Sequence, residues 1–266
     1  AILNGHVVDE NVVLVVDETT PVWFNPTDIC HSLSDGSFIF ASERSGFRHL
    51  HQVGPEAGKV RAITSGDGRV VSREEVIWVD ETHQTVYFLC TALNNPTQMG
   101  LCCASFAAHD EVDSSAAAFK QLTPFNMDCT AACVMGTKFG VKAVAVISNC
   151  STPHRTVLYD LSVAEQMKES LLVQSQAPTP LIPFNPPEFF SFKSERHGNV
   201  IHGCLYTPPG FTKTQSEGRK LFPVIVDIYG GPHVQQVKDT WGITARAMRQ
   251  MWAQHGYVVM VVDNVG

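Results

Sequence analysis

A tyrosine followed by two glycines and a proline is the part of this sequence that points most clearly to chemistry. Tyr229-Gly230-Gly231-Pro232 closes an apolar run that begins at Leu221, and sites in open α/β sheets form beyond the carboxyl ends of such strands. A tyrosine O–H in this place can donate to the oxyanion that develops when a carbonyl group is attacked, and glycine lets the backbone approach a substrate. The same residues also fit a tyrosine that only packs against a tight turn.

The groups that would complete hydrolytic chemistry around Tyr229 do not occur in the 266 residues. The pattern G-x-S-x-G, which places a nucleophilic serine on a sharp strand-to-helix turn, is absent. Without a nucleophile, none of the 11 histidines can be given a catalytic role.

The eight cysteines lack the paired spacing of a zinc site, and we expect neither a metal nor another cofactor. Reduced, buried thiols in a cytoplasmic protein are the favoured interpretation, and secretory disulfides are the alternative. Asn149-Cys150-Ser151 matches the glycosylation pattern, but such matches are common by chance. The cysteines are Cys30, Cys90, Cys102, Cys103, Cys129, Cys133, Cys150 and Cys204.

The composition is that of a globular protein with one large or two modest domains, 44% hydrophobic and with a formal net charge of −7. No basic stripe interleaved with aromatics occurs, so we expect no nucleic-acid partner. No apolar run has the length of a membrane span, so we expect no membrane segment. Both ends of the sequence suggest cuts through a longer protein, because the first residues resemble no leader and the last ones follow directly on a strand.

The sequence up to about residue 180 has the pattern of an all-β structure. Short apolar or alternating runs recur between turn signals such as Ser34-Asp35-Gly36 and Asn94-Asn95-Pro96. Many short strands of this kind fit a propeller or a sandwich, and the pattern alone does not choose between them. The runs cover residues 12–16, 37–41, 76–79, 85–89, 142–147 and 156–159.

A proline-dense stretch, residues 177–187, is the best candidate for a domain boundary. Beyond it, residues 189–192 and 200–206 have the pattern of strands. Residues 221–229 are almost continuously apolar with one acid, Asp227, as in a strand covered on both faces. A helix is predicted at 243–255 from the spacing of its apolar residues, with Gly256 as its stop, followed by a buried strand at 257–262. Strand, helix and strand predict a βαβ unit with parallel strands.

Residues 221–235, LFPVIVDIYGGPHVQ, resemble the strand and oxyanion loop of the dipeptidyl peptidase IV family, with the greatest similarity to its cytosolic branch, dipeptidyl peptidases 8 and 9. Residues 255–264 resemble the next strand of that family, and residues 187–192 its domain junction. Propeller segments of the family resemble residues 23–29, 40–50, 62–66, 77–79 and 86–88. The similarity runs in order along most of the chain and is poorest at 107–128 and 161–176.

The resemblance implies an all-β propeller fragment at 1–180, followed at 181–266 by the N-terminal part of an α/β-hydrolase domain. Family members are serine aminodipeptidases that remove X-Pro or X-Ala dipeptides, so the implied partner is a peptide with a free N-terminus, and the parent protein can be a homodimer. Tyr229 takes the role of oxyanion donor, and Gly230 and Gly231 form the loop beside the substrate. The triad is expected beyond Gly266, so we expect this stretch alone to be inactive.

A glutamate pair on the family's propeller holds the substrate amine, and it would lie before Ala1. Glu74-Glu75 is not that pair, because it falls beside residues 77–79 in a different blade. One departure is Val265-Gly266, where the family usually has Arg-Gly after the residues matching Asp263-Asn264; we favour an artefact of the terminus. Two other functions stay open, a non-catalytic interaction module and a different α/β-hydrolase such as an acylpeptide hydrolase or an esterase.

Overall fold

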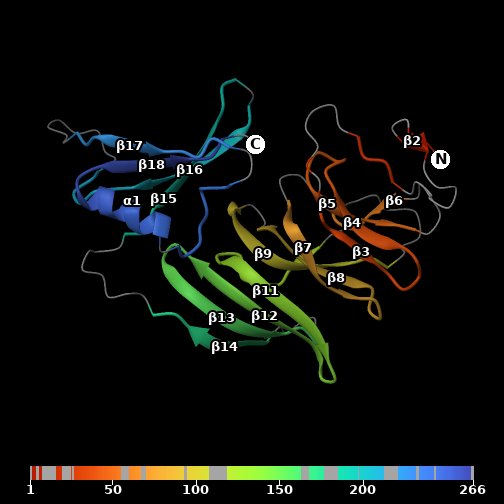
Figure 1. Cartoon of the computed structure of the whole chain (residues 1–266). Helices are drawn as coiled ribbons and strands as arrows, with labels where there is room; N and C mark the ends of the chain where they lie inside the picture. The colour runs from red at the N-terminus through yellow and green to blue at the C-terminus, as the bar shows by residue number, and fades with distance from the viewer. Residues whose placement is uncertain are drawn as a thin grey trace.

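Short strands make up most of the described part of the chain, together with one helix (Figure 1). The computed structural model describes residues 2–3, 6–7, 16–19, 25, 27–54, 60–66, 70–92, 95–107, 119–162, 168–176, 185–196, 198–212, 221–231, 234–242 and 244–264. Of residues 2–3, 6–7, 73–75 and 244–246, only the backbone is described. Residues 177–184 of the proline-dense stretch and Val265-Gly266 lie outside the described residues.

Three four-stranded antiparallel sheets follow one another along the chain, in the orders β3-β4-β5-β6, β10-β9-β8-β7 and β11-β12-β13-β14. Each strand pairs with its neighbour in sequence. At the tight turn between β3 and β4, the Asp35 carboxylate accepts a hydrogen bond from the Ser37 backbone N–H. The five expected strands that lie within the described residues of this part are all present. The strands are β3 (Cys30–Ser32), β4 (Phe38–Ser42), β5 (His49–Val53), β6 (Val60–Ala62), β7 (Val71–Asp80), β8 (Thr85–Ala92), β9 (Asn95–Ser105), β10 (Lys120–Gln121), β11 (Asp128–Thr137), β12 (Gly140–Asn149), β13 (Thr152–Asp160) and β14 (Lys168–Gln174), preceded by the two-residue pair β1 (Ile2–Leu3) and β2 (His6–Val7).

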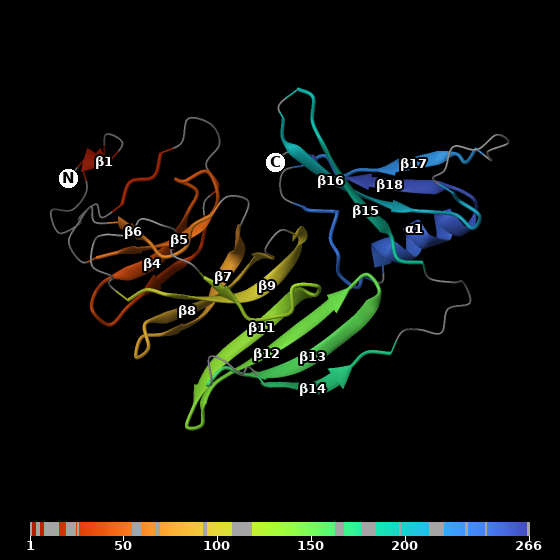
Figure 2. The same ribbon diagram turned by 180° about the vertical axis from the view of Figure 1, so that it is seen from behind.

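The three sheets are arranged along an arc (Figures 1 and 2). Apolar side chains fill the spaces between consecutive sheets. One core cluster joins the first two sheets through residues such as Leu50 and Phe88, both fully buried. A second cluster joins the second and third sheets through residues such as Leu101 and Ile147, also fully buried. Burial of such large side chains is the main stabilising contribution in each sheet pair.

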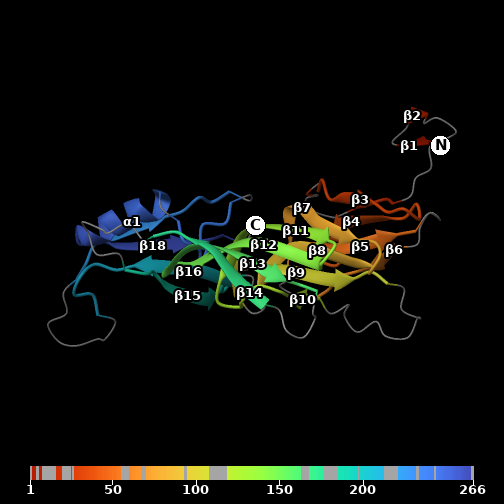
Figure 3. The same cartoon turned by 90° about the horizontal axis from the view of Figure 1, so that it is seen from below.

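A fourth, mixed sheet lies beside this arc together with the helix, as Figure 3 shows. Its order is β15-β16-β18-β17, with β17 parallel to β18 and the other pairs antiparallel. The helix connects β17 to β18, so the predicted βαβ unit is confirmed, and Gly256 (φ +92°) ends the helix as expected. The elements are β15 (Glu188–Lys193), β16 (Val200–Tyr206), β17 (Val224–Asp227), α1 (Thr244–Gln254) and β18 (Val258–Val262).

Two details of this sheet differ from the sequence-based expectation. The strand predicted to be covered on both faces is short, and Val224, Val226 and Ile228 are each more than half exposed. These alternate residues share one face of the strand, whereas Ile225, on the other face, packs against the core of the sheet. On α1, Met248 and Met251 are exposed, while Arg249 and Gln250 are buried. The apolar spacing thus predicted the helix correctly but not the face that it buries.

All eight cysteines are free thiols, and Cys90, Cys102, Cys129 and Cys204 are buried. Among the described residues there is no group of three or more side chains placed to hold a metal ion. The part of the chain that the structure describes also holds no helix that is long and apolar enough to cross a membrane.

Candidate active site

Tyr229 lies two residues beyond the last residue of β17, and about half of its surface (51%) is exposed. β17 pairs in parallel with β18, with Asp227 opposite Val261. The carboxyl ends of both strands therefore meet at one edge of the sheet, the edge where open α/β sheets place their sites. The tyrosine is thus presented outward at the position that its sequence context predicts.

The loop around Tyr229 leaves no room for a side chain at its second glycine. A Cβ atom added to Gly231 would lie 2.4 Å from Cε1 and 3.1 Å from the hydroxyl oxygen of Tyr229. The tyrosine ring therefore lies directly over the backbone of residue 231. Gly230 has φ +71°, a conformation that side-chain-bearing residues rarely adopt, although the space around it is open. Pro232, the last residue of the predicted motif, lies outside the described residues.

Residues 234–242, called the strap below, continue the chain from this loop to α1. The Asp263 carboxylate, directly after β18, accepts hydrogen bonds from the backbone N–H groups of Gln236 (2.8 Å) and Val237 (3.0 Å). The Val237 side chain is fully buried in the core of the mixed sheet. The strap is therefore fixed close to the carboxyl edge that carries Tyr229.

The strap also binds the all-β part of the chain, mainly through Asp239. Its carboxylate accepts hydrogen bonds from the Gln98 side-chain amide and the Cys150 backbone N–H, both at 2.9 Å, and its own N–H donates to the Thr97 carbonyl (2.8 Å). The backbone N–H of Trp241 donates to the Ser148 hydroxyl (3.1 Å). The strap thus joins the mixed sheet to β9 and to the β12–β13 turn.

Asp128, at the start of β11, is a buried acid next to this junction. Its carboxylate accepts a hydrogen bond from the Met99 backbone N–H (2.6 Å) and also bonds the Thr240 side chain of the strap. Burial raises the pKa of Asp128, and the negative charge of Asp239 adds to this, while the hydrogen bonds and Lys238 act in the opposite direction. The junction between the two parts is therefore sensitive to protonation.

Arg249 is a buried cation (4% exposed) on the face of α1 that packs against the sheet. Its Nε–H donates to the Asp227 carboxylate (2.6 Å), and its Nη2 donates to the Gln236 side-chain carbonyl (2.9 Å). The side chain of Tyr206 is a further hydrogen-bond partner. Although burial alone would lower the pKa of Arg249, these bonds and the charge of Asp227 raise it, so the group stays a cation.

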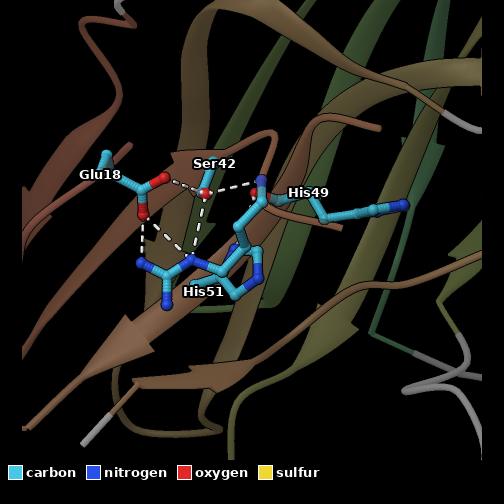
Figure 4. A network of polar contacts seen from close by, with 5 residues as sticks. Glu18, Ser42, His49 and His51 are labelled. Carbon is cyan, nitrogen blue, oxygen red and sulfur yellow. Dashed lines mark hydrogen bonds and ion pairs between the residues drawn. The ribbon is translucent and has the colours of Figure 1, made fainter. Parts of the chain in front are cut away.

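A second polar network lies on the first sheet, away from Tyr229 (Figure 4). The Glu18 carboxylate accepts hydrogen bonds from the Ser42 hydroxyl (2.8 Å) and from Nε of Arg44 (3.0 Å). His51 lies next to these groups, and burial lowers its pKa, so the ring is held neutral. Figure 1 places this sheet at the opposite end of the molecule from β17, so the network ties residues 16–19 to the first sheet and has no part at Tyr229.

Sequence reasoning identified Tyr229, Gly230 and Gly231, which the structure places in one outward-facing loop. It missed Arg249, Asp239 and Asp263, which fix the segments around that loop. The sequence did contain one signal for Arg249. Asp227 is the single acid in an apolar strand, and such an acid needs a cationic partner on a neighbouring element. For Glu74-Glu75 the backbone lies in β7, and the side chains are outside the description.

Comparison with known proteins adds a family match to this geometry. A model of the dipeptidyl peptidase IV (DPP IV) N-terminal region matches residues 5–173. Dipeptidyl peptidase 8 of Mus musculus is 31% identical over 288 residues, which cover 96% of this chain and 30% of that protein, and dipeptidyl peptidase 8 of Homo sapiens gives the same values. A probable dipeptidyl peptidase 4 of Aspergillus flavus is 26% identical over 239 residues, or 87% of this chain and 28% of that protein. The chain therefore spans about 30% of the length of its curated relatives.

Proposed function

Because the chain belongs to the dipeptidyl peptidase IV family, as its sequence predicts, we propose that the whole protein is a serine-type dipeptidyl aminopeptidase. Its substrates are peptides with a free N-terminus, from which it releases X-Pro or X-Ala dipeptides. Residues 1–180 are the C-terminal part of a β-propeller, whose blades are the three antiparallel sheets. Residues 181–266 begin an α/β-hydrolase domain, in which β17, α1 and β18 form the first parallel unit.

The half-exposed tyrosine at the carboxyl end of β17 is the observation that supports a catalytic role for this chain. A serine oxygen from another part of the protein bonds to the carbonyl carbon of the second residue and gives its proton to a general base. The electron pair of the C=O bond moves to the oxygen, and Tyr229 donates its O–H to the resulting oxyanion. The C–N bond then breaks, the leaving amine takes a proton, and water releases the dipeptide from the serine.

The surroundings of Tyr229 suit this role. The hydroxyl lies at the end of a ring that rests on Gly231, so a substrate carbonyl can approach from the exposed side. A donor held in place before the substrate arrives stabilises the transition state without a reorganisation cost. Eight free thiols suit a reducing compartment, and we place the protein in the cytoplasm.

The replacement Tyr229→Phe in the full-length protein removes only the O–H donor. We expect kcat on a Gly-Pro chromogenic substrate to fall about 100- to 1000-fold with little change in KM, because the lost bond forms only as the oxyanion develops. Tyr257→Phe is the matched control, since Tyr257 is a partly exposed tyrosine directly before β18, and it should keep the wild-type kcat. A Tyr229→Phe enzyme with near-normal kcat would refute the oxyanion role.

A further inference from the structure

Arg249 contacts the chain on both sides of the loop that carries Tyr229. Before the loop, its Nε–H donates to Asp227, the last residue of β17 and two residues ahead of Tyr229 (2.6 Å). After the loop, its Nη2 donates to the side chain of Gln236 in the strap (2.9 Å). One guanidinium group thus connects the residue before the loop, Asp227, with a residue after it, Gln236.

The exit side is held by a second contact, which makes this arrangement rigid. The backbone N–H of Gln236 donates to Asp263 (2.8 Å), so Gln236 is bound through both its main chain and its side chain. The cation itself is 4% exposed and rests on α1. The Asp227 side chain is partly exposed (33%), but that of Arg249 is not (5%), so a movement that broke their contact would leave the cation unpaired in the interior.

The choice of arginine matters for such a contact. A guanidinium group presents its N–H donors in a fixed planar fork, so the positions of the acceptors on Asp227, Gln236 and Tyr206 are set relative to one another. A lysine ammonium is a compact charge on a flexible stem, and it can keep the ion pair while losing this geometry. Replacement of Arg249 by lysine therefore keeps the positive charge but removes the fixed orientation of the hydrogen-bond donors.

We propose that Arg249 is a positioning residue for Tyr229, holding the ends of the Tyr229 loop so that the hydroxyl meets the developing oxyanion. The proposal rests on the proposed oxyanion role of Tyr229. Arg249 does not touch the substrate, and it acts through Asp227 and Gln236. Displacement of a catalytic group by about 1 Å is enough to cost up to about a hundredfold in rate.

The test is a double-mutant cycle in the full-length protein, with kcat and KM measured on a Gly-Pro chromogenic substrate. Arg249→Lys should lower kcat about tenfold and leave KM nearly unchanged, since the loop shifts while substrate binding persists. In the Tyr229→Phe background the same replacement should change kcat by less than about twofold, because residues that act as a unit are not additive. An equal loss in both backgrounds would overturn the proposal, because Arg249 would then act independently of Tyr229.

Two further variants separate positioning from folding. Gln236→Leu leaves the Arg249–Asp227 pair intact and removes the contact at the exit of the loop; it should lower kcat several-fold, about as much as a small displacement requires. Gln250→Leu is the matched control on the same buried face of α1, because Gln250 bonds the Asn185 carbonyl rather than the loop. It should keep the wild-type kcat even if it unfolds at lower temperature.

An unchanged kcat in both Arg249→Lys and Gln236→Leu would also overturn the proposal. The proposed function fails separately, and visibly, if Tyr229→Phe alone keeps its activity. In that case Tyr229 contributes nothing to kcat that Arg249 could modify, and both proposals fail. If Tyr229→Phe lowers kcat but Arg249→Lys leaves it unchanged, only the positioning role of Arg249 is rejected.

Discussion

At the residue scale, the orientation of the Tyr229 ring depends on Gly231, which has no side chain. The tyrosine ring occupies the space that a Cβ of residue 231 would need, with a separation of 2.4 Å to the nearest ring atom. Real Cβ atoms do not approach other atoms so closely, so the ring and an added methyl group cannot share this space. Gly231 thereby allows the ring to lie across the backbone of its own loop.

We expect Gly231→Ala in the full-length protein to lower kcat on a Gly-Pro chromogenic substrate by about tenfold, because the methyl group pushes the Tyr229 ring away from its position. Gly54→Ala is the control, since it adds the same methyl group where nothing lies within 4 Å, and it should leave kcat unchanged. A Gly231→Ala enzyme with the wild-type kcat would show that the ring position is not important for turnover.

Sequence alone could propose Tyr229 as a candidate site residue, because a chemically distinctive motif ends an apolar strand. It could not identify Arg249, because periodicity assigns the buried face of a helix by hydrophobicity. On α1, Met248 and Met251 are about half exposed while Arg249 is buried through its partners. The cation is stabilised by a carboxylate and an amide from two other elements, and such a pairing appears only in three dimensions.

At the element scale, the strap contacts the elements that hold the Tyr229 loop in place, namely α1, the end of β18 and the all-β part of the chain. Its backbone N–H groups donate to the Asp263 carboxylate after β18, and its Gln236 side chain accepts a hydrogen bond from α1. Asp239 connects it to β9 and the β12–β13 turn. The segment has no regular secondary structure of its own. Its backbone N–H groups therefore bond to the side chains of Asp263 and Ser148 and to the Thr97 carbonyl rather than forming a strand ladder.

Asp128 gives this junction a specific pH dependence. Burial raises the pKa of Asp128 above the ordinary value of 3.8, so in acid the folded state binds a proton at a higher pH than the unfolded state does. The contribution of this group to stability is then greatest below the ordinary value and is lost as the pH rises through the raised pKa.

We therefore expect Asp128→Asn in the full-length protein to raise the unfolding temperature, relative to wild type, more at about pH 7 than at about pH 4. The measurement is thermal unfolding of both proteins followed over that range. Asp35→Asn is a control on the surface, where hydrogen bonds to Ser37 lower the pKa of Asp35 and the dependence has the opposite sign. A pH-independent difference for Asp128→Asn would contradict the raised pKa.

The strands were largely predictable from the sequence, because runs such as 85–89 and 200–206 alternate or stay apolar between clear turn residues. The strap was not, because residues 234–242 have no periodicity and owe their conformation to distant partners such as Gln98 and Ser148. The exposed face of β17 was also unpredictable, since an apolar run does not reveal how many neighbouring strands cover it.

At the scale of the whole molecule, three antiparallel sheets form an arc, and the mixed sheet joins it through the strap (Figures 1 and 2). Asp239 and Thr240 contact the all-β part, and a few residues earlier Gln236 contacts Arg249 beside the Tyr229 loop. The two parts of the chain are therefore connected by hydrogen bonds that end close to the candidate catalytic residue.

The central claim is tested most directly by the activity of the full-length protein on a matched pair of substrates, Gly-Pro p-nitroanilide and its N-acetylated form. A dipeptidyl aminopeptidase requires the free amine, so the account predicts rapid release of p-nitroaniline from the first substrate and none from the second. Release of acetylglycine from the second substrate, without p-nitroaniline, would instead indicate an acylpeptide hydrolase, because such an enzyme cleaves directly after the acylated residue. Cleavage of neither, by a folded full-length protein, would contradict the proposed peptidase activity and favour an interaction module.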